Sequence, residues 1–251
     1  MGKLIAVTGK GGVGKTTISA LLVQYMLQKG SSPILVVDAD PNSNLNEVFG
    51  LQVGETIGSI REDMSAISGT LPAGMAKHEY LQMKVQECMV EAKGFDLVVM
   101  GRPEGPGCYC FTNNVLRDVL KILAKQYPRI VIDNEAGMEH MSRRITTTMD
   151  HLLIVSDTSL RSMLAAERIV ELVKELKLTV GSMYLLLNRV HNGIPAEVKK
   201  RADAIGIPLI GAIPEENMVH DFDGNGRPLV ELPDDSSTVR ALKEIADRLN
   251  I

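Results

Sequence analysis

The sequence predicts an α/β fold, with a mostly parallel sheet covered by helices on both faces. The first observation is a set of short, continuously apolar runs, which are typical of strands buried on both sides. The second is that segments with apolar residues at helical spacing lie between these runs. The third is that the 251 residues contain no low-complexity linker and no internal repeat, so a single domain over 1–251 is expected.

The expected strands and helices alternate along the chain. "KLIAVTG" is a short apolar run that ends at glycines, which indicates a buried strand. After it, apolar residues such as Ile18 and Leu22 recur at helical spacing until Gly30 stops the helix. "PILVVDAD" is a second strand with acids at its carboxyl end, and later segments repeat both patterns. The expected strands are 3–9, 33–40, 95–101, 129–135, 151–157, 183–189 and 208–214, and the expected helices are 15–29, 77–92, 111–126, 159–177, 195–204 and 237–249.

Charge and composition restrict the classes of partner. The net charge is −4, hydrophobic residues make up 45%, and no long run of Lys or Arg appears. Nucleic acids and anionic membranes are therefore not expected as primary partners. The first residues lack the apolar stretch of a signal peptide, and no segment approaches the ~18 apolar residues of a membrane span. Three cysteines, an odd number, then predict a reducing, cytoplasmic location.

"GKGGVGKT", Gly9 to Thr16, fits the P-loop pattern, because a predicted strand precedes it and a predicted helix follows it. Glycines allow backbone N–H groups to turn around phosphate oxygens, and the helix N-terminus adds positive potential. Lys15 is expected to bridge the β- and γ-phosphates of ATP, and Thr16 to hold Mg²⁺. The alternative is a glycine-rich turn that matches by chance. The expected nucleotide-binding residues of this segment are Gly9, Gly11, Gly12, Val13, Gly14, Lys15, Thr16 and Thr17.

Lys10 follows the first P-loop glycine and resembles the extra lysine of the deviant Walker A ATPases. In that class the lysine reaches across a dimer interface to the partner's nucleotide. The resemblance therefore implies a homodimer in which Lys10 is a catalytic residue beside Lys15. The alternative, which Lys10 alone favours, is a solvated surface lysine.

The segment "DADPNSN" resembles switch I of the same class. Asp40 matches the acid that orients the attacking water, and is the third implied catalytic residue. Asn44 matches a polar residue near Mg²⁺, and Asp38 lies two residues before Asp40, where it would also approach the metal. The alternative for Asp38 and Asp40 is a pair of turn-forming or helix-capping acids.

Three later segments resemble the class in the same order along the chain. "VIDNEAG" is similar to switch II, with an acid at the strand end and a glycine hinge. "LLLNR" ends at the position of the adenine-recognition motif, and "IPEE" resembles the segment that closes over the base. The nucleotide-binding residues that these matches imply are Asp133, Gly137, Asn188, Arg189, Pro214 and Glu215.

Cys108 and Cys110 stand in "GPGCYCFTNN", after a run of Gly and Pro and at the start of a helical pattern. Cysteines this close rarely form a disulfide without strain. Across the twofold axis of the implied dimer, four thiolates would converge and could hold one Zn²⁺, Ni²⁺ or Fe–S cluster. The alternative is two ordinary buried thiols. Cys88 lies in an amphipathic helical stretch and is expected to serve packing.

"GRPEGPGCYCFTNN" and "DNEAGMEH" together resemble the nickel-inserting maturation ATPases of carbon monoxide dehydrogenase, the CooC type, and their relatives that serve acetyl-CoA synthase. The resemblance covers almost the whole chain. It implies hydrolysis of ATP with Mg²⁺, one Ni²⁺ or Zn²⁺ bound by Cys108 and Cys110 of both chains, and delivery to carbon monoxide dehydrogenase or acetyl-CoA synthase. Two alternatives share the ATPase core: an Fe–S cluster carrier, and a spatial-organisation ATPase of the cell-division or partition type.

Overall fold

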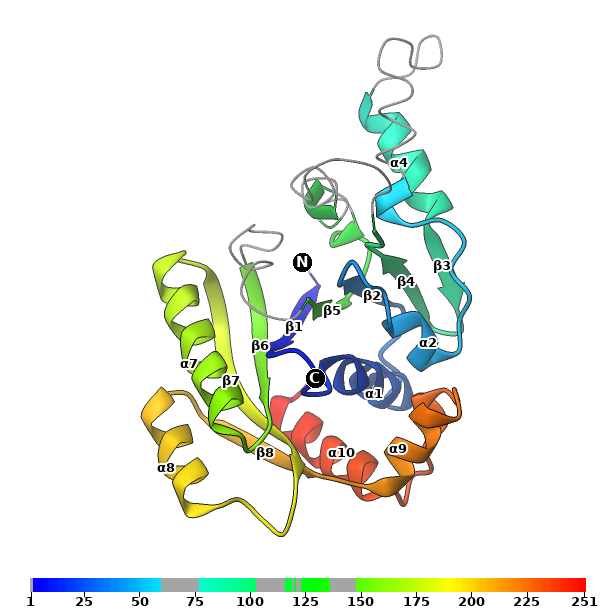
Figure 1. Ribbon diagram of the computed structural model, residues 1–251. Helices are drawn as coiled ribbons and strands as arrows, with labels where there is room; N and C mark the ends of the chain where they lie inside the picture. Colours follow the sequence, from blue (N-terminus) through cyan, green and yellow to red (C-terminus); the bar gives the residue numbers. More distant parts are fainter. Residues whose placement is uncertain (1, 60–76, 103–115, 119, 121–122, 136–147) are drawn as a thin grey trace.

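The computed structural model describes residues 2–59, 77–102, 116–118, 120, 123–135 and 148–251 (Figure 1). Its eight-stranded sheet has the order β3-β4-β2-β5-β1-β6-β7-β8. Neighbouring strands pair in parallel except β3 and β4, so the predicted α/β class with a mostly parallel sheet is confirmed. The strands are β1 (Lys3–Gly9), β2 (Ile34–Ala39), β3 (Met89–Ala92), β4 (Phe95–Val99), β5 (Arg129–Asn134), β6 (Thr148–Ser156), β7 (Thr179–Val190) and β8 (Leu209–Pro214).

Helices cover both faces of the sheet, and each face has its own apolar core. Along β1, Leu4 and Ala6 belong to one core and Ile5 and Val7 to the other, because successive side chains of a strand point to opposite faces. The first core includes side chains of α7 and α8, and the second includes those of α1 and α10. The helices are α1 (Lys15–Gln28), α2 (Leu45–Phe49), α4 (Lys77–Glu87), α7 (Leu160–Glu175), α8 (Ala196–Ile205), α9 (Asn217–Gly224), the 3₁₀ turn η1 (Leu229–Glu231) and α10 (Ser237–Leu249).

The predicted helix 77–92 is wrong in its last part. The helix ends at Glu87, and Met89–Ala92 form the edge strand β3, which pairs antiparallel with β4. Ala92 lies opposite Phe95, so a two-residue turn joins the strands, and Gly94 adopts the positive φ of 88° that such turns require. The apolar residues of this stretch fit the spacing of a helix as well as that of a strand. The Lys93–Gly94 turn favours the strand, because it allows Met89–Ala92 to pair with β4.

Other differences are smaller. β6 begins at Thr148, three residues before the expected 151, and β7 runs from Thr179 to Val190 instead of 183–189. The short elements α2, α9 and η1 were not expected. The expected helix 111–126 lies partly outside the described residues, although 116–118, 120 and 123 are helical. Within the described part of the chain, no helix is both long enough and apolar enough to cross a bilayer.

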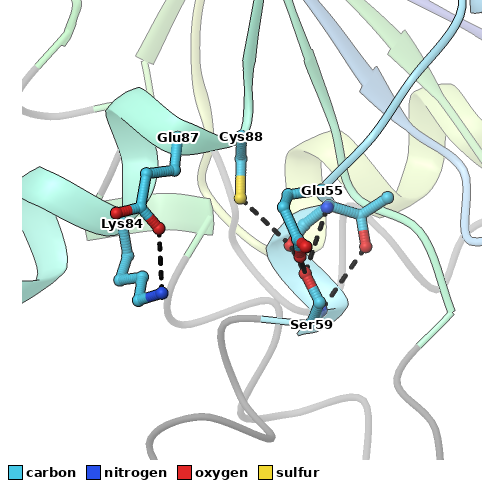
Figure 2. A network of polar contacts seen from close by, with 6 residues as sticks. Glu55, Ser59, Lys84, Glu87 and Cys88 are labelled. Atoms are coloured by element: carbon cyan, nitrogen blue, oxygen red, sulfur yellow. Dashed lines mark hydrogen bonds and ion pairs between the residues drawn. The ribbon is translucent and has the colours of Figure 1, made fainter.

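Cys88 lies at the end of α4 and is only 2% exposed, which agrees with the expected packing role. Its thiol donates a hydrogen bond to the carbonyl of Thr56 at 3.2 Å. Figure 2 shows Cys88 directed toward segment 55–59, where Ser59 donates to the Glu55 carboxylate at 2.6 Å. The N–H of Gly58 in turn donates to the carbonyl of Met100, directly after β4, at 2.8 Å. The segment therefore ties the end of α4 to the carboxyl end of β4.

Candidate nucleotide-binding site

The P-loop joins the carboxyl end of β1 to the first turn of α1, as predicted. Gly14 stands at the N-cap of α1 with φ of 90°, a backbone conformation that favours glycine. A Cβ on Gly14 would also lie 2.4 Å from Nδ2 of Asn188, so no larger residue fits. Val13 is fully buried and fixes the loop to the core. The first N–H groups of α1 therefore remain directed outward for an anion.

The Lys15 side chain is 7% exposed and lies beside its own loop. Its ammonium donates to the carbonyl of Lys10 at 3.4 Å. Burial lowers the pKa of Lys15, and the negative charges of Asp133 and Asp40 oppose that change. A buried cation held next to a backbone loop matches the contact expected for a phosphate group.

Asp38 and Asp133 lie side by side because β2 and β5 pair in register at this position. Both carboxyl groups are buried, and burial raises the pKa of each. The Thr16 and Ser19 hydroxyls hydrogen-bond to Asp133, the latter at 3.2 Å. A nearby divalent cation would offset this concentration of buried negative charge. A hydroxyl oxygen together with carboxylate oxygens is a donor set that suits Mg²⁺, so the residues fit the ion.

Asp38 also supports the backbone that follows it. Its Oδ1 accepts from the N–H of Asp40 at 3.0 Å, and its Oδ2 accepts from the N–H of Leu45, the first residue of α2, at 3.0 Å. Asp40 is half-buried, and its Oδ1 accepts from the N–H of Asn42 at 2.8 Å. Both acids therefore form the turn and capping contacts that were the alternative interpretation of this pair.

A cleft of about 510 Å³ connects the P-loop with switch I. Its walls include Gly11, Gly12, Gly14, Lys15, Thr16, Thr17, Asp40 and Asn44. Two of the three predicted catalytic residues, Lys15 and Asp40, thus share one cleft. The third, Lys10, has an exposed side chain and is not part of the wall.

The predicted base-binding residues form a smaller cavity that adjoins this cleft. Asn188, Arg189, Pro214 and Glu215 line it together with Gly14 and Thr17 of the P-loop and first helical turn. The Asn188 amide nitrogen donates to the carbonyl of Val13 at 2.8 Å, and the Arg189 guanidinium donates to that of Gly12 at 2.8 Å. The ends of β7 and β8 are thereby attached to the P-loop.

The sequence did not indicate that α9 and η1 line the larger cleft. Val219, His220 and Asp223 of α9 and Arg227 after it face the larger cleft, opposite Glu47 of α2. His220 Nε2 lies 3.0 Å from Oε1 of Glu215, and His191 contacts the other oxygen of the same carboxylate. The only available signal was the two acids of "PEENMVH", which precede an eight-residue amphipathic segment.

Glu216, which lines the smaller cavity, binds the N-terminus of the C-terminal helix α10. Its Oε2 accepts from the hydroxyls of Ser236 and Ser237 at 2.7 and 2.9 Å, and from the N–H of Thr238 at 2.9 Å. A carboxylate at the N-terminus of α10 also meets the positive end of the helix dipole. Burial acts to raise the pKa of Glu216, but the hydrogen bonds from Thr238, Ser236 and Ser237 outweigh it and hold the pKa at about 2.

We expect Glu216→Gln to remove a pH-dependent part of the stability. Because the pKa of Glu216 is depressed, its ionised carboxylate stabilises the fold above pH 4.5, which is the ordinary pKa of a glutamate. This contribution to stability is lost as the pH falls from 4.5 toward about 2. The loss amounts to about 1–2 kcal/mol after screening by solvent. Urea unfolding from neutral pH down to about 3 should show a steeper decline for the wild type than for Glu216→Gln.

Asp234→Asn is the control, because Asp234 forms an exposed ion pair with Lys243 of α10, at 2.9 Å. Its profile should follow that of the wild type closely. Parallel profiles for the wild type and Glu216→Gln would show that the carboxylate does not hold the helix as described.

Gly137, Cys108 and Cys110 lie outside the described residues. Within the part of the chain that is described, no group of three or more His, Cys, Asp or Glu side chains is arranged to hold a metal ion. The expected metal site of Cys108 and Cys110 therefore stays a prediction.

The strand–loop–helix geometry, the buried lysine and the acids at the neighbouring strand ends define a P-loop nucleotide-binding protein. The CobQ/CobB/MinD/ParA nucleotide binding domain matches residues 4–229. The chain belongs to this family of ATP-binding P-loop ATPases.

Relatives of several kinds share the fold. An uncharacterized ATP-binding protein of Methanocaldococcus jannaschii is 43% identical over 248 residues, 98% of either chain. The carbon monoxide dehydrogenase accessory protein CooC of Rhodospirillum rubrum is 30% identical over 245 residues, which cover 91% of this chain and 89% of CooC. The crystal structure of a ParA family ATPase from Chlorobium tepidum superposes with a TM-score of 0.76 at 20% identity, over 99% of both chains.

Proposed function

We propose that the protein is an ATP-dependent nickel chaperone that matures an Ni–Fe–S enzyme, carbon monoxide dehydrogenase or acetyl-CoA synthase. It works as a cytoplasmic homodimer with a metal ion at the interface. The observation that carries the proposal is the pair Cys108 and Cys110 within a chain of this ATPase family. The 30% identity to CooC, over most of both chains, supports the same assignment.

Nickel is the cargo in this proposal. One chain supplies only two sulfur ligands, so a four-sulfur site needs both chains, and one ion serves two chains. Thiolates bind Zn²⁺ in tetrahedral and Ni²⁺ in planar geometry, so metal availability in the cell decides which ion is bound. An Fe–S cluster carrier is the alternative, and its bound cluster would give the protein a visible colour.

The proposed hydrolysis needs no nucleophilic side chain. Backbone N–H groups of the P-loop and the Lys15 ammonium stabilise the charge on the transferred phosphoryl group, and Asp40 orients the water. Thr16 would hold Mg²⁺, with Asp133 and Asp38 behind it, and the ion would neutralise phosphate charge when bound. Lys10 of the second chain completes the site only in the closed dimer, so turnover is slow and nucleotide state controls the dimer.

Spatial organisers of the cell-division or partition type are the second candidate, since they share this fold. A membrane-binding member of that class needs an amphipathic helix whose apolar face is available. In this protein Val239, Leu242, Ile245 and Leu249 of α10 are all buried in the core, with the helix against β8 and α1. The apolar face of α10 is thus occupied by the fold, which favours the metal-loading proposal.

Metal titration under anaerobic, reducing conditions tests the proposal. Ni²⁺ or Zn²⁺ should saturate at one ion per two chains, with thiolate-to-metal absorption that is lost in Cys108→Ser and in Cys110→Ser. Cys88→Ser is the matched control, because the Cys88 thiol is buried and already bonded to Thr56. Saturation at one ion per chain, or tight binding in Cys110→Ser, would contradict the shared site.

A further inference from the structure

Switch I and the start of the cysteine-bearing segment are joined through side chains. The Arg102 guanidinium donates a hydrogen bond to Oδ1 of Asn42. The Asn42 amide nitrogen donates to Oδ1 of Asp40 at 3.0 Å, and the Asn42 backbone N–H donates to the same oxygen at 2.8 Å. Arg102, Asn42 and Asp40 thus form a continuous chain of hydrogen bonds that ends in the nucleotide cleft.

The charges of this chain are arranged consistently. The amide of Asn42 lies between a cation and an anion, with its oxygen toward the guanidinium and its nitrogen toward the carboxylate. Both hydrogen bonds are charge-assisted, and the reversed amide would place oxygen against carboxylate and N–H against guanidinium. Removing Arg102 therefore removes the contact that holds the Asn42 amide in this orientation, and weakens the amide's hydrogen bond to Asp40.

The backbone around Arg102 is fixed to the same strand ends. Asp38 pairs with Val99 in the sheet, and the N–H of Met100 donates to the carbonyl of Asp38 at 2.8 Å. Gly101 is buried at φ of 64° and approaches Thr56 so closely that a Cβ would lie 2.4 Å from its hydroxyl oxygen. Arg102 thus leaves the sheet from a defined position beside switch I.

We infer that Arg102 is a positioning residue for Asp40 that acts through Asn42. The inference rests on the proposed role of Asp40 in orienting the attacking water. The contact between the Arg102 guanidinium and Asn42 then sets how firmly Asp40 is held in that position.

Steady-state ATP hydrolysis tests the positioning role. Arg102→Ala should lower kcat by roughly tenfold, since one charge-assisted hydrogen bond is lost, and should leave KM within about twofold. Arg102→Lys keeps the charge without the planar fork and should recover part of the rate. An unchanged kcat in Arg102→Ala would overturn the inference.

A double-mutant cycle separates this effect from general loosening. Asn42→Leu should lower kcat at least as much as Arg102→Ala, because it removes the amide contact with Asp40 as well as the contact with Arg102. The double variant should be no slower than Asn42→Leu, because Arg102 acts only through the Asn42 amide. If kcat of the double variant fell by the product of the two single decreases, the two residues would act independently. Arg102 and Asn42 are exposed, so the thermal midpoints should stay within about 2 °C of wild type. Lys243→Ala, on α10, removes an exposed ion pair elsewhere and should keep the wild-type kcat.

Asp40→Ala separates this inference from the proposed role of Asp40. Loss of hydrolysis in Asp40→Ala together with an unchanged kcat in Arg102→Ala would overturn the inference alone. Unchanged hydrolysis in Asp40→Ala would overturn the role of Asp40 in the proposed function.

Discussion

Lys15→Ala is expected to abolish ATP binding at concentrations where the wild type is saturated. Lys15 is 7% exposed, its ammonium lies beside the P-loop backbone, and its charge interacts with those of Asp133 and Asp40. Its removal takes away a charge-assisted phosphate contact and leaves these acids facing the phosphates. The affinity should fall at least ~100-fold, equivalent to about 3 kcal/mol. Calorimetric titration with Mg–ATP measures it.

Lys29→Ala is the matched control, because Lys29 directly follows α1 at its opposite end and pairs with Asp247 on the surface, at 3.2 Å. It should bind ATP as the wild type does. Thermal unfolding of Lys15→Ala should be measured alongside, so that a loss of ATP binding is separated from a loss of the fold. Retention of wild-type affinity in Lys15→Ala would show that the cleft is not the phosphate site.

The strands and the P-loop were predictable because their signals are local. A continuous apolar run marks a strand buried on both faces, and the glycines before Lys15 mark a loop that must turn tightly. The edge strand β3 was not predictable in the same way, because Met89 to Ala92 fit either period. The hairpin with β4, closed by the Lys93–Gly94 turn, favours the strand, and the apolar pattern of Met89 to Ala92 alone does not show this pairing.

The site shows the same division between local and tertiary information. Asp38 was expected near Mg²⁺ or in a turn, and the structure shows that its carboxylate caps α2 while it lies beside Asp133. His220 was missed as a site residue, and Glu216, although within the predicted segment "IPEE", was not expected to cap α10. Both contacts depend on α9 and α10 lying beside the ends of β7 and β8. Neither helix contains a motif that refers to the nucleotide.

No sequence motif indicated the contact between Asn42 and Arg102 either. The two residues are far apart along the chain and become neighbours only because β2 and β4 are adjacent in the sheet. Parallel strands bring their carboxyl ends to one edge, and so loops that follow different strands meet there. The topology, rather than either motif, therefore brings switch I close to the start of the cysteine-bearing segment.

Lys10→Ala is expected to leave ATP binding intact and to abolish both nucleotide-driven dimerisation and hydrolysis. The side chain of Lys10 is exposed, and among the described residues its ammonium has no hydrogen-bond or ion-pair partner. Lys15 already serves the phosphates of its own chain. The rate should fall at least ~100-fold, because a cation that stabilises the transferred phosphoryl group is lost. Sedimentation with a non-hydrolysable ATP analogue should show dimer for the wild type and monomer for Lys10→Ala.

Complementation distinguishes a lysine that acts across the interface from one that acts within its own chain. Lys10→Ala and Asp40→Ala are each expected to be inactive alone. In a mixed dimer, the chain that lacks Lys10 keeps Asp40 and receives the lysine of the other chain, so one of its two sites is complete. Equal mixing should restore at most about half of the wild-type rate, the value reached when every dimer is mixed, because one of the two sites of a mixed dimer is complete. Lys200→Ala, on the surface of α8, should hydrolyse ATP normally. Absence of any restored activity in mixed dimers would mean that Lys10 acts within its own chain. Normal dimerisation and hydrolysis by Lys10→Ala alone would mean that Lys10 is a solvated surface residue.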